Sequence, residues 1–386
     1  MKKRFLRDIA EIQTGPFGSQ LHKEDYVDVG TPIVTVEHLG NRVFSEQNLP
    51  MVSDADKSRL SKYILRKGDI VFSRVGSVDR CSFVDKKHDG WMFSGRCLRV
   101  RPSEEIDSLF LYYFFCLNAT KEFVRSIAVG ATMPSINTKL LGEVEVLCPE
   151  IEEQRKIADI LSKIDDKIEE NQKINENLEQ QALALFTNFY DQSNTEVNFT
   201  DLIQILGGGT PKTGESTYWN GGIPFFTPKD VGTPYTLATE KTITEDGLSH
   251  CNSRLYPVNT VFVTARGTVG KIGLAGVPMA MNQSCYALSG KNIHQLLVYF
   301  YTLKAVDRLK HKASGAVFDA IITRDFETEQ VFKLSEDDTN TFIKIAEPMY
   351  QSILNNSVEN QRLIALRNSL LPKLMSGEID VSNIDI

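Results

Sequence analysis

The sequence IEEQRKIADILSKIDDKIEENQKINENLEQQALALFTNFY, at residues 151–190, decides the fold. It contains neither Pro nor Gly and is rich in Glu, Lys, Gln, Leu, Ile and Ala, a composition that favours one long α-helix of about 60 Å. Its seam positions alternate by three and four residues, which is typical of a coiled coil and would not be needed in a solvated surface helix. The seam consists of Ile157, Leu161, Ile164, Ile168, Asn171, Asn175, Leu178, Ala182 and Leu185.

The same pattern returns 185 residues later, near the carboxyl end. It predicts a second long helix that ends near Gly377. Its seam consists of Phe342, Ala346, Met349, Ile353, Asn356, Asn360, Leu363, Arg367 and Leu370.

Two seams in one chain are expected to pair, because neither helix can bury its apolar stripe alone. An antiparallel pair with a pseudo-twofold axis would place Asn171 opposite Asn360 and Asn175 opposite Asn356. A buried Asn lowers the stability of a seam but fixes its register. We interpret the four Asn as a register lock; the alternative is that they are accidental polar positions.

The rest of the chain is repeated as well. Residues 8–15 resemble residues 201–208, and residues 68–74 resemble residues 259–266. Short β-rich runs punctuated by Gly, Pro and Asn predict mixed α/β domains. The predicted order is a domain at residues 1–149, a helix at 150–191, a second domain at 192–335 and a second helix at 336–386. The fold class is therefore α/β, with two similar domains separated by helices that pair as an antiparallel coiled coil.

This architecture indicates a function. Two similar but non-identical domains related by a twofold axis match the symmetry of duplex DNA. Proteins with such symmetry bind two half-sites that are separated by whole helical turns of about 34 Å. The net charge of −7 looks unsuitable for such a role. It divides into +2, −6, +1 and −4 along the four segments, so the acid lies in the two helices.

Three segments resemble the specificity subunit of type I restriction–modification systems. CPEIEEQRKI and the following residues to 185 resemble its central conserved helix, and LLPKLMSGEI at 370–379 resembles the end of the second helix. GATMPSIN at 130–137 resembles the stretch that closes a target recognition domain. The second copy, GAVFDAI at 315–321, keeps the Gly and Ile but lacks the Pro.

The resemblance implies that each domain reads one part of a bipartite, asymmetric double-stranded DNA site. It implies that the helices set the spacing and dock two methyltransferase subunits, which restriction–translocation subunits can join. S-adenosylmethionine, ATP and Mg would then belong to partner subunits, with no cofactor, metal or catalytic residue in this chain. With no secretory signal and no apolar run long enough to span a membrane, we expect a cytoplasmic protein.

A search for catalytic chemistry supports this division of labour. There is no Asn/Asp-Pro-Pro-Tyr motif for methylation of a base amino group, and the six Cys and six His show no metal-ligand spacing. The glycine-rich stretch at 207–214 lacks the G-K-[ST] ending of a phosphate-binding loop.

Candidate DNA contacts are polar or cationic residues in glycine-containing loops, where the backbone can approach phosphate. The residues in these loops are Thr14, Phe17, Ser19, Arg74, Ser77, Arg80, Lys212, Thr213, Arg266, Thr268 and Lys271. Simple turn chemistry is the alternative interpretation. The cationic helix ends are a further candidate, or else a solvated face: Lys121 and Arg125, then Arg308, Lys310 and Lys312.

Two other functions remain possible from the sequence. The chain could be an adaptor with two protein-binding domains on a coiled-coil spacer and no DNA role. It could instead be a nuclease or methylase with diverged motifs.

Overall fold

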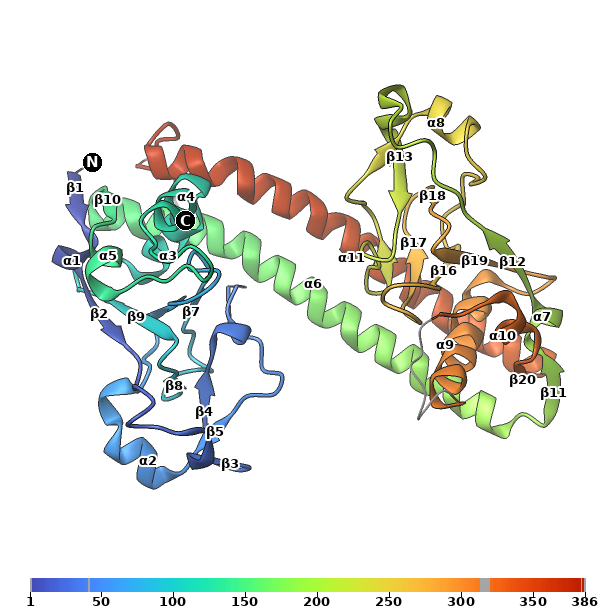
Figure 1. Ribbon diagram of the computed structural model, residues 1–386, viewed down its shortest axis with the longest axis horizontal. Helices are drawn as coiled ribbons and strands as arrows, with labels where there is room; N and C mark the ends of the chain where they lie inside the picture. Colours follow the sequence, from blue (N-terminus) through green and yellow to red (C-terminus); the bar gives the residue numbers. More distant parts are fainter. Residues whose placement is uncertain (1, 41, 313–319, 383, 385–386) are drawn as a thin grey trace. The chain divides into compact units, whose positions relative to one another are not determined.

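The computed structural model describes residues 2–40, 42–312, 320–382 and 384. The chain divides into two compact units, one of Met1–Lys167 with Leu363–Ile386 and one of Ile168–Arg362. Each unit therefore joins one globular part to portions of two long helices, α6 (Ile151–Gln192) and α11 (Glu336–Ser376) (Figure 1). Gly377, at φ +78°, stops α11 in the left-handed conformation that glycine adopts at low cost. Both predicted helices are confirmed.

A four-stranded antiparallel sheet forms the centre of the first unit, in the order β2 (Ala10–Thr14), β9 (Cys97–Pro102), β6 (Ile70–Ser73) and β7 (Cys81–Phe83). Its strand β6 is buried on both faces. Phe72 packs edge-on against Phe115 of α3 (Ser108–Cys116), with ring centroids 4.6 Å apart, whereas Val71 belongs to the core on the opposite face. Alternate side chains of a strand point to opposite faces, which explains why this run is continuously apolar.

Smaller elements complete the first unit. They are β1 (Lys2–Phe5) paired with β10 (Glu145–Cys148), the sheet of β3 (Tyr26–Val27), β5 (Met51–Val52), β4 (Thr31–Val34) and β8 (Met92–Phe93), the α-helices α1 (Leu6–Ile9), α2 (Asp54–Arg59), α3 (Ser108–Cys116), α4 (Asn118–Ser126) and α5 (Thr138–Gly142), and the 3-10 helices η1 (Lys23–Asp25), η2 (Val36–His38) and η3 (Ser61–Tyr63).

The second unit repeats this plan. Its central sheet has the order β12 (Ile203–Gly207), β19 (Cys285–Gly290), β16 (Val261–Thr264), β17 (Ile272–Ala275) and β14 (Tyr235–Thr236). The first four strands pair as β2, β9, β6 and β7 do, so the predicted duplication is confirmed. The other elements are β11 (Thr195–Asn198), β13 (Trp219–Phe226), β15 (Thr242–Ile243), β18 (Ala280–Met281), β20 (Gln330–Lys333), α7 (Phe199–Leu202), α8 (Glu245–Ser249), α9 (Gln295–Lys312), α10 (Thr323–Glu327) and η4 (Ser216–Tyr218).

The long helices pair within the second unit through their Asn residues. Asn171 Nδ2 donates to Asn360 Oδ1 at 2.9 Å, and Asn356 Nδ2 donates to Asn175 Oδ1 at 2.8 Å. From the first of these contacts to the second, the residue number rises along α6 and falls along α11, so the two helices are antiparallel. These are the two Asn contacts that the heptad positions predict. Asn171 and Asn360 are buried, and each amide has a further partner, which avoids the cost of an unsatisfied polar group.

The first unit holds its own portions of these helices with a buried polar cluster. Asp165 of α6 accepts a hydrogen bond from Tyr113 of α3 at 2.8 Å and one from Arg367 of α11 at 2.6 Å. Burial and the neighbouring carboxylate raise the pKa of Tyr113, so its hydroxyl stays protonated and donates. A single carboxylate thus fastens the globular part to both helices.

Candidate nucleic-acid interface

One edge of the central sheet in the first unit collects three loops. Because β9 runs antiparallel to both β2 and β6, the end of β2, the start of β9 and the end of β6 lie at the same edge. The loops there are residues 15–20, 74–80 and 94–96. The first and second contain the predicted DNA-contacting residues of this unit, except Thr14, which is the last residue of β2. The third was missed, because its place at the edge follows from strand pairing and not from a local motif.

Glycine allows the loops at this edge to pack together. A Cβ added to Gly15 would overlap the carbonyl oxygen of Ser94, and one added to Gly95 would overlap that of Pro16. Arg74 then ties the loops to one another. Its Nη1 donates to the Gly95 carbonyl at 3.0 Å, and its guanidinium lies 5.9 Å from the centroid of the Phe17 ring.

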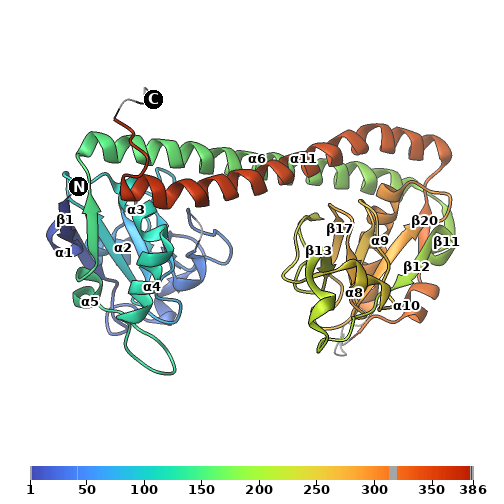
Figure 2. The ribbon, with the colours of Figure 1, turned by 90° about the horizontal axis from the view of Figure 1, so that it is seen from above.

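The chain between α4 and α5 joins the same edge; Figure 2 shows it projecting as a long loop. Gly76 N donates to the Pro134 carbonyl at 2.8 Å, and Ile136 N donates to the Arg74 carbonyl at 2.9 Å. The segment at 130–137, picked out by its resemblance to a closing stretch, therefore lies against the predicted loop 74–80. Its counterpart at 315–321 lies outside the described residues, except for Ala320 and Ile321.

The predicted contact residues of the first unit differ in exposure. Phe17, Ser19, Ser77 and Arg80 are exposed, whereas Thr14 and Arg74 are half-buried. The Arg80 guanidinium donates to the carbonyl of Leu39, which limits its freedom.

The second unit brings the corresponding loops to the corresponding edge. Residues 208–213 follow β12, residues 265–271 join β16 to β17, and residues 282–284 precede β19. A Cβ on Gly208 would overlap the backbone of Asn282, so the glycine-rich stretch serves close loop packing. The predicted residues are all exposed: Lys212, Thr213, Arg266, Thr268 and Lys271.

A comparison with protein families identifies the family of this chain. The model of the type I restriction modification DNA specificity domain matches residues 1–180 and again residues 192–333. The chain belongs to this family. As a specificity subunit, it supplies DNA sequence specificity to a type I restriction–modification system and is not itself the enzyme.

Relatives of similar length support this conclusion. The chain is 23% identical over 407 residues to the MjaIX specificity subunit of Methanocaldococcus jannaschii, covering 98% of this chain and 93% of that protein. It is 24% identical over 404 residues to the HindI specificity subunit of Haemophilus influenzae, covering 83% and 88%. The crystal structure of an S subunit from M. genitalium has the same fold, with a TM-score of 0.64 at 17% identity and coverage of 97% and 95%.

The arginines of the two loops, Arg74 and Arg266, do not occupy equivalent places in the two halves of this specificity subunit. Arg74 directly follows β6, and its carbonyl accepts a hydrogen bond from Ile136 N at 2.9 Å. In the second unit Ala265 directly follows β16, and its carbonyl accepts a hydrogen bond from Ile321 N at 3.0 Å. Arg266 instead forms a bridge with Ala320, as Val75 does with Ser135. Adjacent residues in extended chain point to opposite sides, so Arg266 does not occupy the place of Arg74.

Two positions in loop 74–80 have counterparts in loop 265–271. Counted from the ends of β6 and β16, Ser77 corresponds to Thr268 and Arg80 corresponds to Lys271. The two halves therefore present the same backbone frame with partly different side chains.

Some of the cationic side chains at the helix ends lie close to carboxylates. Arg125 pairs with Asp79 of loop 74–80 at 2.6 Å. In the second unit Lys312 pairs with the buried Glu329, and Arg308 lies 3.9 Å from the same carboxylate. Lys310 lies instead beside loop 265–271, where a Cβ added to Gly270 would come 2.6 Å from its Cε.

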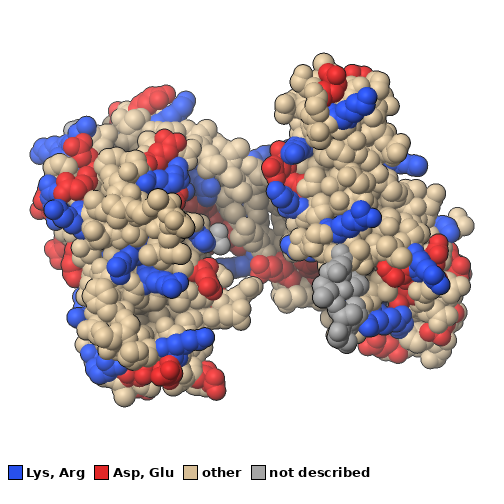
Figure 3. Space-filling view, viewed as in Figure 1, with Lys and Arg blue, Asp and Glu red and all other residues tan. Residues whose placement is uncertain are grey.

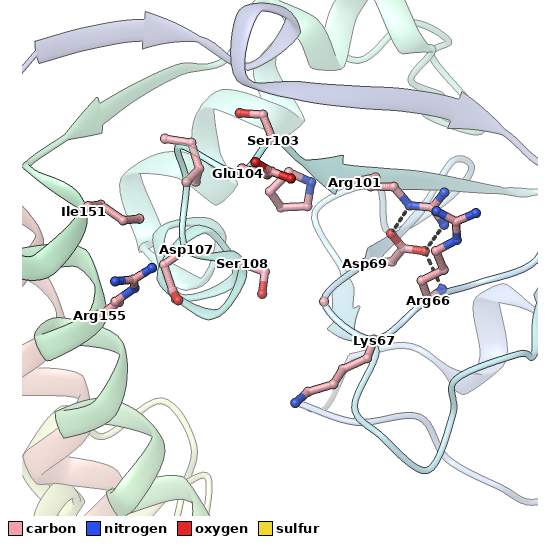
Figure 4. A pocket seen from close by; sticks show the side chains of 13 residues that line it. Arg66, Lys67, Asp69, Arg101, Ser103, Glu104, Asp107, Ser108, Ile151 and Arg155 are labelled. Carbon is pink, nitrogen blue, oxygen red and sulfur yellow. Dashed lines mark hydrogen bonds and ion pairs between the residues drawn. The ribbon is translucent and has the colours of Figure 1, made fainter.

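A polar pocket of about 320 Å³ in the first unit lies away from the loops. Arg101 and Asp69, which lie on its wall, form a two-pronged ion pair with both distances 2.7 Å (Figure 4). Asp69 precedes β6 and Arg101 lies near the end of β9, whereas the loops are attached to the other ends of these strands. The pocket is therefore at the opposite edge of the sheet, beside the start of α6.

The surface charge of the specificity subunit is mixed. Figure 3 shows Lys and Arg interspersed with Asp and Glu over the face in view. Within residues 2–40, 42–312, 320–382 and 384, no group of three His, Cys, Asp or Glu could hold a metal ion. The six cysteines are free, and Cys81, Cys97, Cys148 and Cys285 are buried. No helix in the described part of the chain is long and apolar enough to cross a membrane.

Proposed function

We propose that each loop edge reads one half of a bipartite, asymmetric double-stranded DNA site, with residues 1–149 and 192–335 as the two target recognition domains. The loop edge of the first unit consists of residues 15–20, 74–80 and 94–96, and that of the second unit consists of residues 208–213, 265–271 and 282–284. The observation that carries this proposal is the repeated sheet edge. The same loops meet in both units, but they present different side chains. Arg, Lys, Ser and Thr are the types that bind phosphates and base edges.

In this proposal the paired helices, at residues 150–191 and 336–386, fix the separation of the recognition domains. Their acidic surface suits protein partners better than phosphate, so we assign to them the docking of two methyltransferase subunits. Restriction–translocation subunits join the same assembly. S-adenosylmethionine, ATP and Mg bind to those partners, and the complex works in the cytoplasm.

Fluorescence anisotropy tests the DNA role. The chain, assembled with its methyltransferase subunits, is titrated against labelled random duplex at low and high salt. We expect binding that weakens steeply with salt, because phosphate neutralisation releases counterions. Absence of salt-sensitive binding would favour the protein-binding adaptor instead.

The loop edge of the second unit can be tested by charge removal. Lys271→Ala is expected to weaken binding of random and specific duplex alike by about 5-fold, and to reduce the salt dependence by about one phosphate contact. Lys291→Ala is the matched control, because Lys291 is also exposed but follows the opposite end of β19. Equal anisotropy curves for the two variants would contradict the placement of DNA at this edge.

The register lock can be tested by changing Asn171, Asn175, Asn356 and Asn360 together to Leu. We expect a higher urea midpoint but more than one gap length or oligomeric state, because Leu packs in any register of the seam. Sedimentation and methylation mapping measure both properties. Asn177→Leu, on the exposed face of α6, is the control. A quadruple variant with one oligomeric state and one gap would refute the lock.

A further inference from the structure

Three large apolar side chains are exposed at the loop edge of the first unit. Phe17 is 57% exposed, Val129 is 54% exposed and Met133 is 63% exposed. The hairpin that carries Val129 and Met133 is hydrogen bonded to the backbone of Arg74 and Gly76, and the Arg74 guanidinium lies 5.9 Å from the centroid of the Phe17 ring. Apolar groups gathered on a polar surface are typical of a binding site.

The hairpin that carries Met133 is held in place before anything binds. Val129 and Ser135 exchange two backbone hydrogen bonds, of 2.9 and 2.7 Å. Gly130 turns the chain at φ +105°, and a Cβ there would lie 2.6 Å from the Met133 carbonyl oxygen. A preformed loop loses little conformational entropy on binding, which favours a recognition role for its tip.

The chemistry of duplex DNA identifies the occupant. The C5-methyl of thymine is the apolar group that base pairs present in the major groove. Methionine is flexible and polarisable, so it can pack closely against such a group. Loop 74–80, which is hydrogen bonded to the hairpin, adds Arg74 and Ser77, whose cationic and polar groups suit phosphates and polar base edges.

We propose that Met133, on the same hairpin as Val129 and joined through Arg74 to the loop of Phe17, contacts a thymine methyl in the half-site read by the first unit and so determines part of its sequence preference. This inference rests on the proposed DNA-reading function and adds a specific base contact to it. The contact is apolar, so it depends on the methyl group and not on ionic strength.

The test uses the complex with methyltransferase subunits and duplexes carrying the mapped site, in which each thymine of this half-site is replaced in turn by uracil. For the wild type, uracil at one position is expected to weaken binding about 4-fold, as expected for loss of one buried methyl. Met133→Ala is expected to bind the thymine duplex several-fold more weakly and to be insensitive to uracil at that position. Phe123→Ala, which removes a 41% exposed ring from α4, should behave as the wild type.

Three results would overturn the proposal. Met133→Ala could remain as sensitive to uracil as the wild type, or the mapped half-site could contain no thymine at which uracil matters. Met133→Ala could also weaken assembly with the methyltransferase subunits in the absence of DNA, which would make the patch a protein-docking surface. Failure of the DNA-reading function itself is distinguishable, because the wild-type complex would then not prefer the mapped site over random duplex.

Discussion

Replacing residues 1–149 with the recognition domain of another specificity subunit is expected to change one half of the methylated site completely and to leave the other half unchanged. The physical reason is that the first and last strands of the domain, β1 and β10, pair with each other. In β1 and β10, Lys2 lies opposite Cys148, so both ends of the graft meet on one two-stranded ribbon beside the start of α6. Methylation mapping of DNA from cells that express the chimera measures the outcome.

The reciprocal exchange of residues 192–335 provides the control. Its ends meet in the same way, since Thr195 lies opposite Lys333 in β11 and β20. This chimera should change only the other half-site. If either exchange alters both half-sites, or neither, the assignment of one half-site to each domain is wrong.

The second large effect is expected from Asp165→Ala, which should destabilise the first unit by about 3–5 kcal/mol. Asp165 is 5% exposed and accepts hydrogen bonds from Tyr113 and Arg367. Its removal leaves a buried hydroxyl and a partly buried guanidinium without their acceptor, the situation in which breaking an ion pair is most costly. Urea unfolding of a Trp219→Phe background measures this, because Trp91, in the first unit, is then the one tryptophan left of two.

The neighbouring carboxylate makes a matched control. Asp166 pairs with Arg42, but its side chain is 63% exposed, so Asp166→Ala should cost less than about 1 kcal/mol. Similar unfolding midpoints for the two variants would show that the buried cluster does not fasten the globular part to the helices.

The helices were predictable because a heptad is a local pattern with a long-range consequence. The positions of Asn171 and Asn175 in one seam, and of Asn356 and Asn360 in the other, were sufficient to predict which residues meet. No such signal marks residues 94–96 or 282–284. They reach the loop edge only because β9 and β19 pair antiparallel with their neighbours, and pairing partners cannot be read from one short strand.

Two other interpretations were limited because the contacts that decide them are not local in the sequence. Aligning residues 68–74 with residues 259–266 did not show that Arg74 corresponds to Ala265 and not to Arg266, because the sequence alone did not show where β16 ends. The cation clusters were also ambiguous, because the buried Glu329, which attracts Arg308 and Lys312, is distant from them in the sequence. The duplication itself was visible, since the order of its features persists over most of the chain.

The central claim is that paired helices hold two divergent DNA-reading domains at one fixed separation. Genome-wide mapping of methylated bases, in cells with and without this chain, tests it most directly. The account predicts one chain-dependent motif, made of two different half-sites with a single gap length. A contiguous motif, or half-sites at variable gaps, would contradict it.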